Sequence, residues 1–315
     1  MRCILCGNDS SNVITKKIRS GEERNVFYCE NCDLGILDDR RSEQELKDFY
    51  AECYRKEHTP TINTESNPQE LFDLYSKFQD SRLSLIKDKL GPDKSLLEIG
   101  CSAGMFLYNV KPYVGEVNGI DYDVNSVQFA GEKCSCNVFN VAIENTDLPE
   151  KSFDIICMFQ MLEHVKDPVD FLRSVSKYLK DDGVLYIEVP NLRDALIYAY
   201  DLPHHYQFYF HASHLFYYSE KSLKKLLGMI GFEGEVFYTQ DYNFLNHMHW
   251  MMLDAPQGSC DAGLSSPALK LRNSLEPGKS DALNAFIKDV DKQYKELLAD
   301  IGLTSNISFI GAKRK

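Results

Sequence analysis

Between residues 94 and 190 the chain alternates short apolar runs with segments whose apolar positions recur at helical spacing. A short apolar run is typical of a buried strand, whereas the helical spacing predicts an amphipathic helix. Strands are expected at 94–99, 116–120, 137–140, 153–158 and 183–189, with helices at 104–110, from about 125, and at 168–179. Strands and helices that alternate in this way form a mainly parallel sheet with helices on both faces. The pattern therefore predicts a doubly wound α/β fold.

Outside this core the pattern is less regular. Before it, helices are expected at 42–54 and 69–90, joined by a polar, turn-rich connection. After it, two helix–strand pairs are expected, and each pair follows a segment without hydrophobic periodicity. These are helices at 219–228 and 281–300 and strands at 232–238 and 306–312.

These patterns divide the chain into three regions. Residues 1–40 form a cysteine-rich module, and residues 41–90 form a helical connection and cap. Residues 91–315 form the α/β domain, with lid insertions near 191–218, which is dense in Tyr, Phe and His, and near 241–280, which is expected to be irregular.

The cysteine-rich module carries two Cys-x-x-Cys pairs. They are Cys3 with Cys6 and Cys29 with Cys32. Short strands are expected between the pairs, at 13–19 and 25–28. Four thiolates in two such knuckles can close a tetrahedral zinc site, which has no open position and is therefore structural. The spacing predicts a small zinc ribbon. The alternative is that these cysteines are redox-active or unpaired.

The overall charge narrows the class of partner. The 315 residues carry a formal net charge of −12, so a nucleic-acid backbone or an anionic membrane surface is disfavoured as the main partner. No apolar run approaches the length of a membrane span, and the N-terminus lacks the pattern of a secretion signal. We expect a cytoplasmic protein that acts on a small molecule and does not insert into a membrane.

The stretch Leu96–Gly104 joins the first core strand to the first core helix. Gly100 and Gly104 bracket a run of small residues, a geometry that brings a ligand against backbone N–H groups. The run does not fit the G-x-G-x-x-G of a dinucleotide site, and it lacks the Gly-Lys-Ser/Thr of a phosphate-binding loop. Glu98, at the strand end, suits a cationic ligand and would repel a pyrophosphate. These residues favour S-adenosylmethionine, which carries an ammonium and a sulfonium group and no phosphate.

Asp121 stands at the end of the next strand. A carboxylate in this position accepts hydrogen bonds from the ribose hydroxyls of nucleosides bound to other α/β sheets. Tyr122 follows and is placed to pack on the adenine. The alternative role for Asp121 is the N-cap of the next helix, but its position at the strand end favours the ligand role.

The order of these motifs resembles that of the class I S-adenosylmethionine-dependent methyltransferases over about residues 69–240. The segments that carry the resemblance are Leu97–Gly104, Asp121, Leu148-Pro149, Ser152–Asp154 and Leu162–Pro168. It implies a Rossmann-like seven-stranded sheet. It also implies cofactor contacts from Glu98, Gly100 and Gly104 at the methionine end, Asp121 at the ribose, Ile143 and Glu144 beside the adenine, and Phe159 and Gln160 near the amino-acid moiety or the methyl group. Ser102 replaces a glycine often found at its position, and its small side chain is compatible with that place.

Other segments resemble bacterial methyltransferases that act on sugars. The cysteine ribbon is followed by Tyr50 and Tyr54, which are placed to reach the pocket, and 210–219 matches the active-site loop of those enzymes. In the sugar-nucleotide C-methyltransferases this loop carries a Glu-His pair, whereas here Ser213 precedes His214. This change disfavours carbon as the acceptor. A further resemblance, to surface-polysaccharide gene products, lies in Asn246, His247 and Trp250.

Transfer to a hydroxyl requires a base that takes its proton, and histidine suits this task because its unperturbed pKa is about 6.5. His214 is our first choice, because its loop follows the strand ends that form the site. His211, His247 and the tyrosine Tyr50 are further candidates. His164 is also a candidate, although in this fold it commonly braces the loop after the fourth strand. The alternative for each histidine is a hydrogen-bonded structural role.

We therefore expect methyl transfer from S-adenosylmethionine to a sugar or nucleotide-linked sugar of surface glycan or secondary metabolite synthesis, with oxygen as the favoured acceptor atom. The alternatives are methylation of nitrogen, carbon or a phosphate-derived group on a related precursor, and a non-catalytic zinc-ribbon binding protein. The complete set of Glu98, Gly100, Gly104 and Asp121 argues against the non-catalytic alternative.

Overall fold

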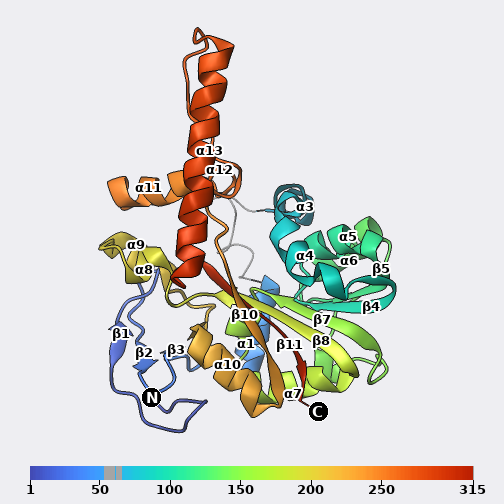
Figure 1. Cartoon of the computed structure of the whole chain (residues 1–315). Helices are drawn as coiled ribbons and strands as arrows, with labels where there is room; N and C mark the ends of the chain where they lie inside the picture. The colour runs from blue at the N-terminus through green and yellow to red at the C-terminus, as the bar shows by residue number, and fades with distance from the viewer. Residues whose placement is uncertain (53–60, 62–65, 315) are drawn as a thin grey trace.

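The computed structural model of the chain describes residues 1–52, 61 and 66–314. Tyr54 lies outside the described residues, as does the side chain of Tyr50, whose backbone belongs to α1 (Glu43–Glu52). Figure 1 shows a central sheet, a small N-terminal module beside it, and a long C-terminal helix that projects away from the body.

Seven strands of the described chain form the central sheet, in the order β10-β11-β8-β7-β4-β5-β6. They are β4 (Gly91–Ile99), β5 (Val114–Ile120), β6 (Asn137–Phe139), β7 (Phe153–Phe159), β8 (Leu179–Pro190), β10 (Phe232–Thr239) and β11 (Asn306–Lys313). The neighbours from β6 to β8 pair in parallel, whereas β11 is antiparallel to both β8 and β10. The predicted α/β fold with a seven-stranded sheet is confirmed.

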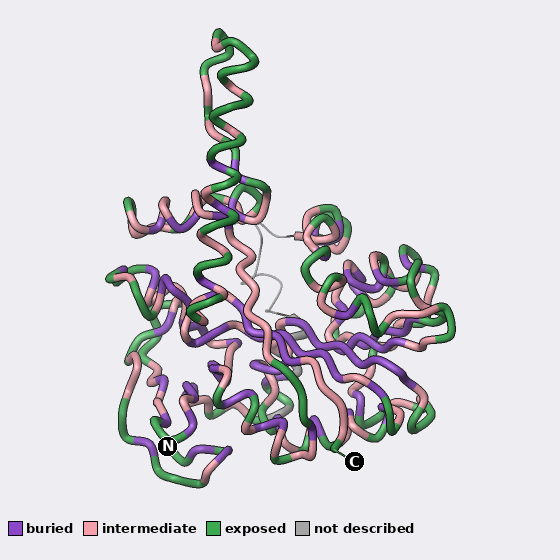
Figure 2. Tube along the Cα trace, viewed as in Figure 1, coloured by how far each residue is buried: buried purple, intermediate pink, exposed green. Residues whose placement is uncertain are grey.

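Helices cover both faces of the sheet because successive strand residues point to opposite sides. In β4, Leu96 packs in one core with α5 (Met105–Val110) and α6 (Val124–Cys134). Its neighbour Leu97 packs in the other core with α7 (Pro168–Tyr178) and α10 (Glu220–Met229). Buried residues accordingly concentrate along the central strands in Figure 2. β7, at the centre, is buried along its whole length.

The single helix expected at 69–90 is interrupted. It consists of α3 (Pro68–Tyr75) and α4 (Asp80–Ile86), each followed by one turn of 3₁₀ helix. Asn67 begins α3 with a capping box. Near its end the buried Gln79 donates its side-chain amide to the Tyr75 carbonyl at 2.8 Å, so a side chain occupies the carbonyl that a continuous helix would bond through its backbone.

The N-terminal module shares a sheet with a distant part of the chain. Its strands are β1 (Val13–Thr15), β2 (Val26–Cys29) and β3 (Leu34–Leu37), and β9 (Phe216–Tyr218) pairs antiparallel with β3 as the fourth strand. The sequence pattern did not predict β3 or β9. Buried residues of the module also join the same hydrophobic core as α7 and α10. The module is therefore built into the domain rather than tethered to it.

The two C-terminal insertions contain more helix than expected. Residues 191–218 include α8 (Ala195–Tyr198) and α9 (Pro203–Tyr209), and 241–280 includes α11 (Phe244–Leu253) and α12 (Asp261–Leu264). α11 showed no helical periodicity because apolar residues occupy most of its positions. The projecting helix is α13 (Pro277–Asp300). None of the described helices combines the length and apolar character needed to cross a membrane.

Candidate active site

A cavity of about 1390 Å³ lies beyond the carboxyl ends of β4, β5, β7 and β8. The structure brings most of the sequence-predicted site residues to its walls: Glu98, Gly100, Ser102, Asp121, Tyr122, Ile143, Glu144, Phe159, Gln160, His164, His211 and His214. Gly104 begins α5 directly behind the turn. In open α/β sheets this edge is where ligands bind, so the fold places the candidate residues where a site is expected.

The turn after β4 depends on backbone angles that favour glycine. Gly100 has φ +80°, and a Cβ there would lie 2.8 Å from Cγ of Met161. Gly104 has φ +79°, and a Cβ there would lie 2.9 Å from Cβ of Ala130 in α6. Ser102 has φ +48°, a left-handed conformation that costs a side chain about 1 kcal/mol. Three positions of the turn therefore adopt the backbone conformation that favours glycine, although one of them is a serine.

Asp121 is held at the end of β5 by this turn. Its carboxylate accepts hydrogen bonds from the backbone N–H groups of Ser102, at 2.7 Å, and Asp123, at 2.9 Å. The N-cap of α6 is Asp123, which accepts from the N–H groups of Asn125 and Ser126. The alternative role of Asp121 as that cap is therefore wrong, and its carboxylate is oriented toward the cavity edge by the turn.

Glu98 ends β4 with its carboxyl group buried. Its side chain is 4% exposed, and its Oε2 has no hydrogen-bond partner among the described residues. Burial raises the pKa of Glu98 to about 8, against the opposing effect of nearby Arg82 and with a further upward contribution from Asp121. A cationic or N–H-bearing ligand in the cavity would satisfy the unpartnered oxygen and stabilise the carboxylate.

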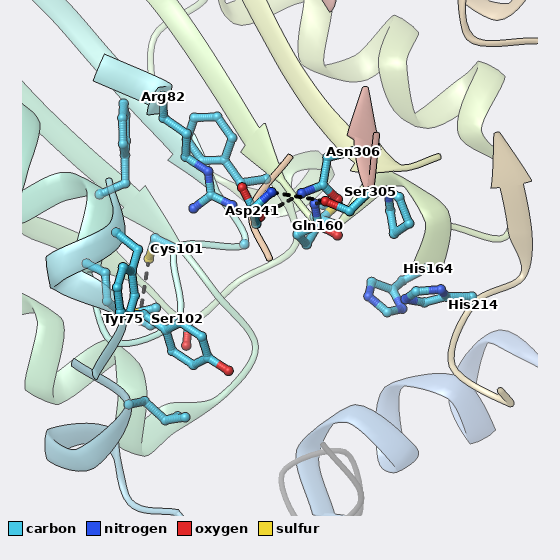
Figure 3. A pocket seen from close by; sticks show the side chains of 18 of the residues that line it. Tyr75, Arg82, Cys101, Ser102, Gln160, His164, His214, Asp241, Ser305 and Asn306 are labelled. Carbon is cyan, nitrogen blue, oxygen red and sulfur yellow. Dashed lines mark hydrogen bonds between the residues drawn. The ribbon is translucent and has the colours of Figure 1, made fainter. Parts of the chain in front are cut away.

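A network of charged and amide groups that the sequence analysis missed forms the wall beside Gln160. Arg82 of α4 lies 2.6 Å from Oε1 of Glu188, and Gln160 donates to the same oxygen at 3.2 Å. Gln160 also donates to Asn306 at 3.0 Å, and Asn306 donates to Asp241 at 2.7 Å. Figure 3 shows Gln160, Asn306 and Asp241 of this network next to one another, with Arg82 nearby. The network fixes the amide of Gln160 in one orientation.

One signal could have found this network. Glu188 lies in the apolar strand β8, where a charged side chain is almost never buried unless it is paired. Its partner Arg82 occurs in a mixed polar helix, and nothing in the local pattern distinguishes it from a solvated arginine.

The candidate histidines gather around a buried carboxyl group. His164 and His214 place their Nε2 atoms 3.8 and 3.7 Å from Oε1 of Glu163, which is 1% exposed. The loop holds the rings from the other side: Nδ1 of His164 is 2.7 Å from the Ser213 carbonyl, and Nδ1 of His211 is 2.7 Å from the Ser213 hydroxyl. In Figure 3 the rings of His164 and His214 lie side by side.

Burial controls the charge of this cluster. It raises the pKa of Glu163 to about 8 and lowers the pKa of His164 to about 4. Both shifts favour the neutral form near pH 7, so the contact between the two groups is not that of an ion pair.

Aromatic and polar side chains form the opposite wall. His205 of α9 packs edge-on against Trp250 of α11, with ring centroids 4.4 Å apart. His247 lies beside them, and Gln240 and Tyr294 hold its two ring nitrogens at 3.0 and 2.8 Å. Burial lowers the pKa of His247 to about 3, so this ring is neutral and braced.

The four paired cysteines meet in the N-terminal module. The Sγ atoms of Cys3, Cys6, Cys29 and Cys32 lie within 4.8 Å of one another, and those of Cys6 and Cys29 are 3.7 Å apart. Tetrahedral zinc with Zn–S bonds of about 2.3 Å requires S–S edges of about 3.8 Å. Lys225 of α10 reaches Cys32 with its Nζ 3.2 Å from the sulfur. The donor set and spacing fit a structural zinc ion.

Comparison with known proteins gives a consistent assignment. Residues 69–235 match the family model described as a methyltransferase domain. The chain is 28% identical over 137 residues to a ubiquinone biosynthesis O-methyltransferase of Glaesserella parasuis, a match that covers 40% of this chain and 58% of that protein. It is 35% identical over 107 residues to phosphoethanolamine N-methyltransferase 1 of Arabidopsis thaliana, covering 32% of this chain and 22% of the relative.

Two further similarities concern a curated relative and a solved structure. A probable S-adenosylmethionine-dependent methyltransferase of Mycobacterium tuberculosis is 25% identical over 138 residues, 42% of this chain and 50% of the relative. Among solved structures, a SAM-dependent methyltransferase from Archaeoglobus fulgidus aligns with a TM-score of 0.49 at 20% identity, covering 77% of this chain and 99% of that one. The chain thus spans 22–58% of the length of these curated relatives.

Proposed function

Because this chain belongs to the class I S-adenosylmethionine-dependent methyltransferases, we propose that it methylates a hydroxyl group of a sugar or a nucleotide-linked sugar. The cofactor supplies an electrophilic methyl group. The task of the protein is to hold the acceptor oxygen in line with that group and to remove its proton.

The proposed cofactor site combines the turn with its flanking strand ends. Glu98, Gly100, Ser102 and Gly104 would hold the methionine end, with the unpartnered oxygen of Glu98 as an acceptor for the ammonium group. Asp121, oriented by two backbone N–H groups, would accept from the ribose hydroxyls. The remaining proposed contacts are Tyr122, Ile143 and Glu144 beside the adenine, and Phe159 and Gln160 near the methyl group.

The sugar proposal is supported by the composition of the opposite wall. A sugar ring presents apolar C–H faces and a rim of hydroxyls, which match aromatic rings and fixed hydrogen-bonding groups. Trp250 and His205 offer the rings, while Gln240 and Asp241 offer polar groups that line the same cavity.

His214 is our first candidate for the group that takes the acceptor proton. The neighbouring rings are held by the loop itself, since His164 contacts the Ser213 carbonyl and His211 the Ser213 hydroxyl. Such contacts suit bracing. His214 lines the cavity beside them, with its Nε2 3.7 Å from Oε1 of the Glu163 carboxyl group.

One observation carries the proposal: a single cavity contains both the glycine turn and the histidine cluster. The test is transfer of labelled methyl from S-adenosylmethionine to a panel of sugars and nucleotide sugars, followed by NMR assignment of the methylated atom. An O-methyl sugar is the expected product. Transfer to phosphoethanolamine or to a phenol, and to no sugar, would overturn the proposal.

For the N-terminal module we propose a structural zinc ion held by Cys3, Cys6, Cys29 and Cys32. The proposal is supported by the mutual spacing of the four sulfurs and by their burial, with Cys6 the least enclosed. Since all four positions around the metal are filled by thiolates, it would stabilise the module rather than take part in chemistry.

A further inference from the structure

Glu163 is a buried carboxyl group without a hydrogen-bond donor. It is 1% exposed, and neither oxygen has a hydrogen-bond partner among the described residues. Within the described part of the chain no lysine or arginine pairs with it, and the imidazoles of His164 and His214 lie 3.8 and 3.7 Å from its Oε1. A buried carboxylate without donors is costly, so such a group is normally matched by a cation or a proton.

The orientation of His164 does not supply Glu163 with the missing hydrogen-bond donor. A backbone carbonyl can only accept a hydrogen bond, so the Nδ1 atom that lies 2.7 Å from the Ser213 carbonyl carries the proton of the ring. The Nε2 atom of the same ring lies 3.8 Å from Oε1 of Glu163. This separation is too long for a hydrogen bond. Histidines that bind metals commonly show this arrangement, with the second ring nitrogen donating to a backbone carbonyl.

We propose that Glu163, His164 and His214 bind a divalent first-row transition metal ion of the class of Mn²⁺, Fe²⁺, Co²⁺ or Zn²⁺. The three ligand atoms already lie within 4.8 Å of one another. Metal–ligand bonds of about 2.0–2.2 Å place neighbouring ligand atoms about 3.0–3.5 Å apart, so shifts of less than about 1 Å complete the site. Two imidazoles and one carboxylate suit these ions.

Three protein ligands leave coordination positions open, and His164 and His214 line the main cavity. A cation there acts as a Lewis acid toward an acceptor hydroxyl and takes over part of the task that we assign to His214. This consequence rests on the proposed function, whereas the binding of the metal does not. The site is also separate from the four cysteines. Their softer sulfur ligands prefer other metal ions than a site of two imidazoles and one carboxylate does.

The test is a titration of the zinc-loaded full chain with Co²⁺, without acceptor, followed by calorimetry and visible absorption. We expect one further equivalent of cobalt, with d–d bands of nitrogen and oxygen ligation and without a sulfur-to-cobalt charge-transfer band. Glu163→Gln keeps the shape of the side chain and should weaken cobalt binding by about tenfold or more. His204→Gln is the matched control, because His204 is an exposed histidine whose side chain is 77% accessible and pairs with Asp254.

Each outcome decides the inference. Uptake that is lost in Glu163→Gln and kept in His204→Gln supports it. No cobalt beyond the cysteine site, or binding that Glu163→Gln leaves unchanged, overturns it. If Glu163→Gln does not fold by circular dichroism, His214→Asn takes its place with the same expectation. Methyl transfer to a sugar by a protein that binds no second metal would remove this inference and leave the proposed function intact.

Discussion

Replacing Asp121 by asparagine should separate cofactor binding from folding. The carboxylate accepts two backbone N–H groups, from Ser102 at 2.7 Å and Asp123 at 2.9 Å. An asparagine has one acceptor oxygen, so its NH₂ group must face one of those donors. The change also removes the charge that strengthens hydrogen bonds from the ribose. Losing a charged hydrogen bond costs about 2–3 kcal/mol, which weakens binding by about 30- to 150-fold.

The assay is isothermal titration with S-adenosylhomocysteine, which needs no acceptor. Asp123→Asn is the matched control, since Asp123 caps α6 and asparagine is an equally good N-cap. Its affinity should stay close to that of the wild type. Unchanged affinity in Asp121→Asn, or an equal loss in both variants, would refute the ribose role of Asp121.

Three further predictions follow from the described contacts. His214→Ala should lower kcat by about 100-fold or more while leaving the affinity for S-adenosylhomocysteine nearly unchanged; equal losses would indicate a structural role. Elemental analysis should find zinc bound by the cysteines, and Cys29→Ser should raise hydrogen exchange in β9 as well as in the module; a metal-free protein with a protected β9 would contradict this. Asp154→Asn should lower the free energy of unfolding by about 2 kcal/mol, because Asp154 pairs with Lys180 at 2.6 Å and Lys94 at 3.1 Å. Burial opposes ionisation of Asp154, but these hydrogen bonds outweigh it and hold its pKa below the usual 3.8, so the stability it contributes is present above about pH 4 and is lost as the pH falls further. Urea unfolding of both proteins at pH 7 and pH 3 tests this, and a difference that does not shrink at pH 3 would be inconsistent with the pairing.

The strands of the central sheet could be predicted because their signal is local. A run such as 153–158 is apolar throughout, and this continuity is typical of a strand buried on both faces. The turn at Gly100 could also be predicted from local sequence, because glycines between a strand and a helix indicate a backbone with positive φ.

The rest depends on contacts between distant residues. β9 has three residues and exists because β3, about 180 residues earlier, offers its edge. The pairing of Arg82 with Glu188 joins α4 to β8, and neither position shows the partner in its own neighbourhood. In the sequence, Glu163 is distinguished only as the residue before His164. Its importance appears when the loop at 211–214 is seen to close over it.

The pairing of β3 with β9 also constrains the order in which the molecule can be completed. During synthesis the first forty residues emerge early, but the edge of β3 stays open until Phe216–Tyr218 has been made. Until then the N-terminal module lacks the fourth strand of its sheet, and the unpaired edge of β3 is exposed to unwanted association. A truncation that removes residues 1–40 would in turn strip β9 of its neighbour and expose the buried side chains of Phe216 and Tyr218. Expression strategies that trim the amino terminus should fail for this reason.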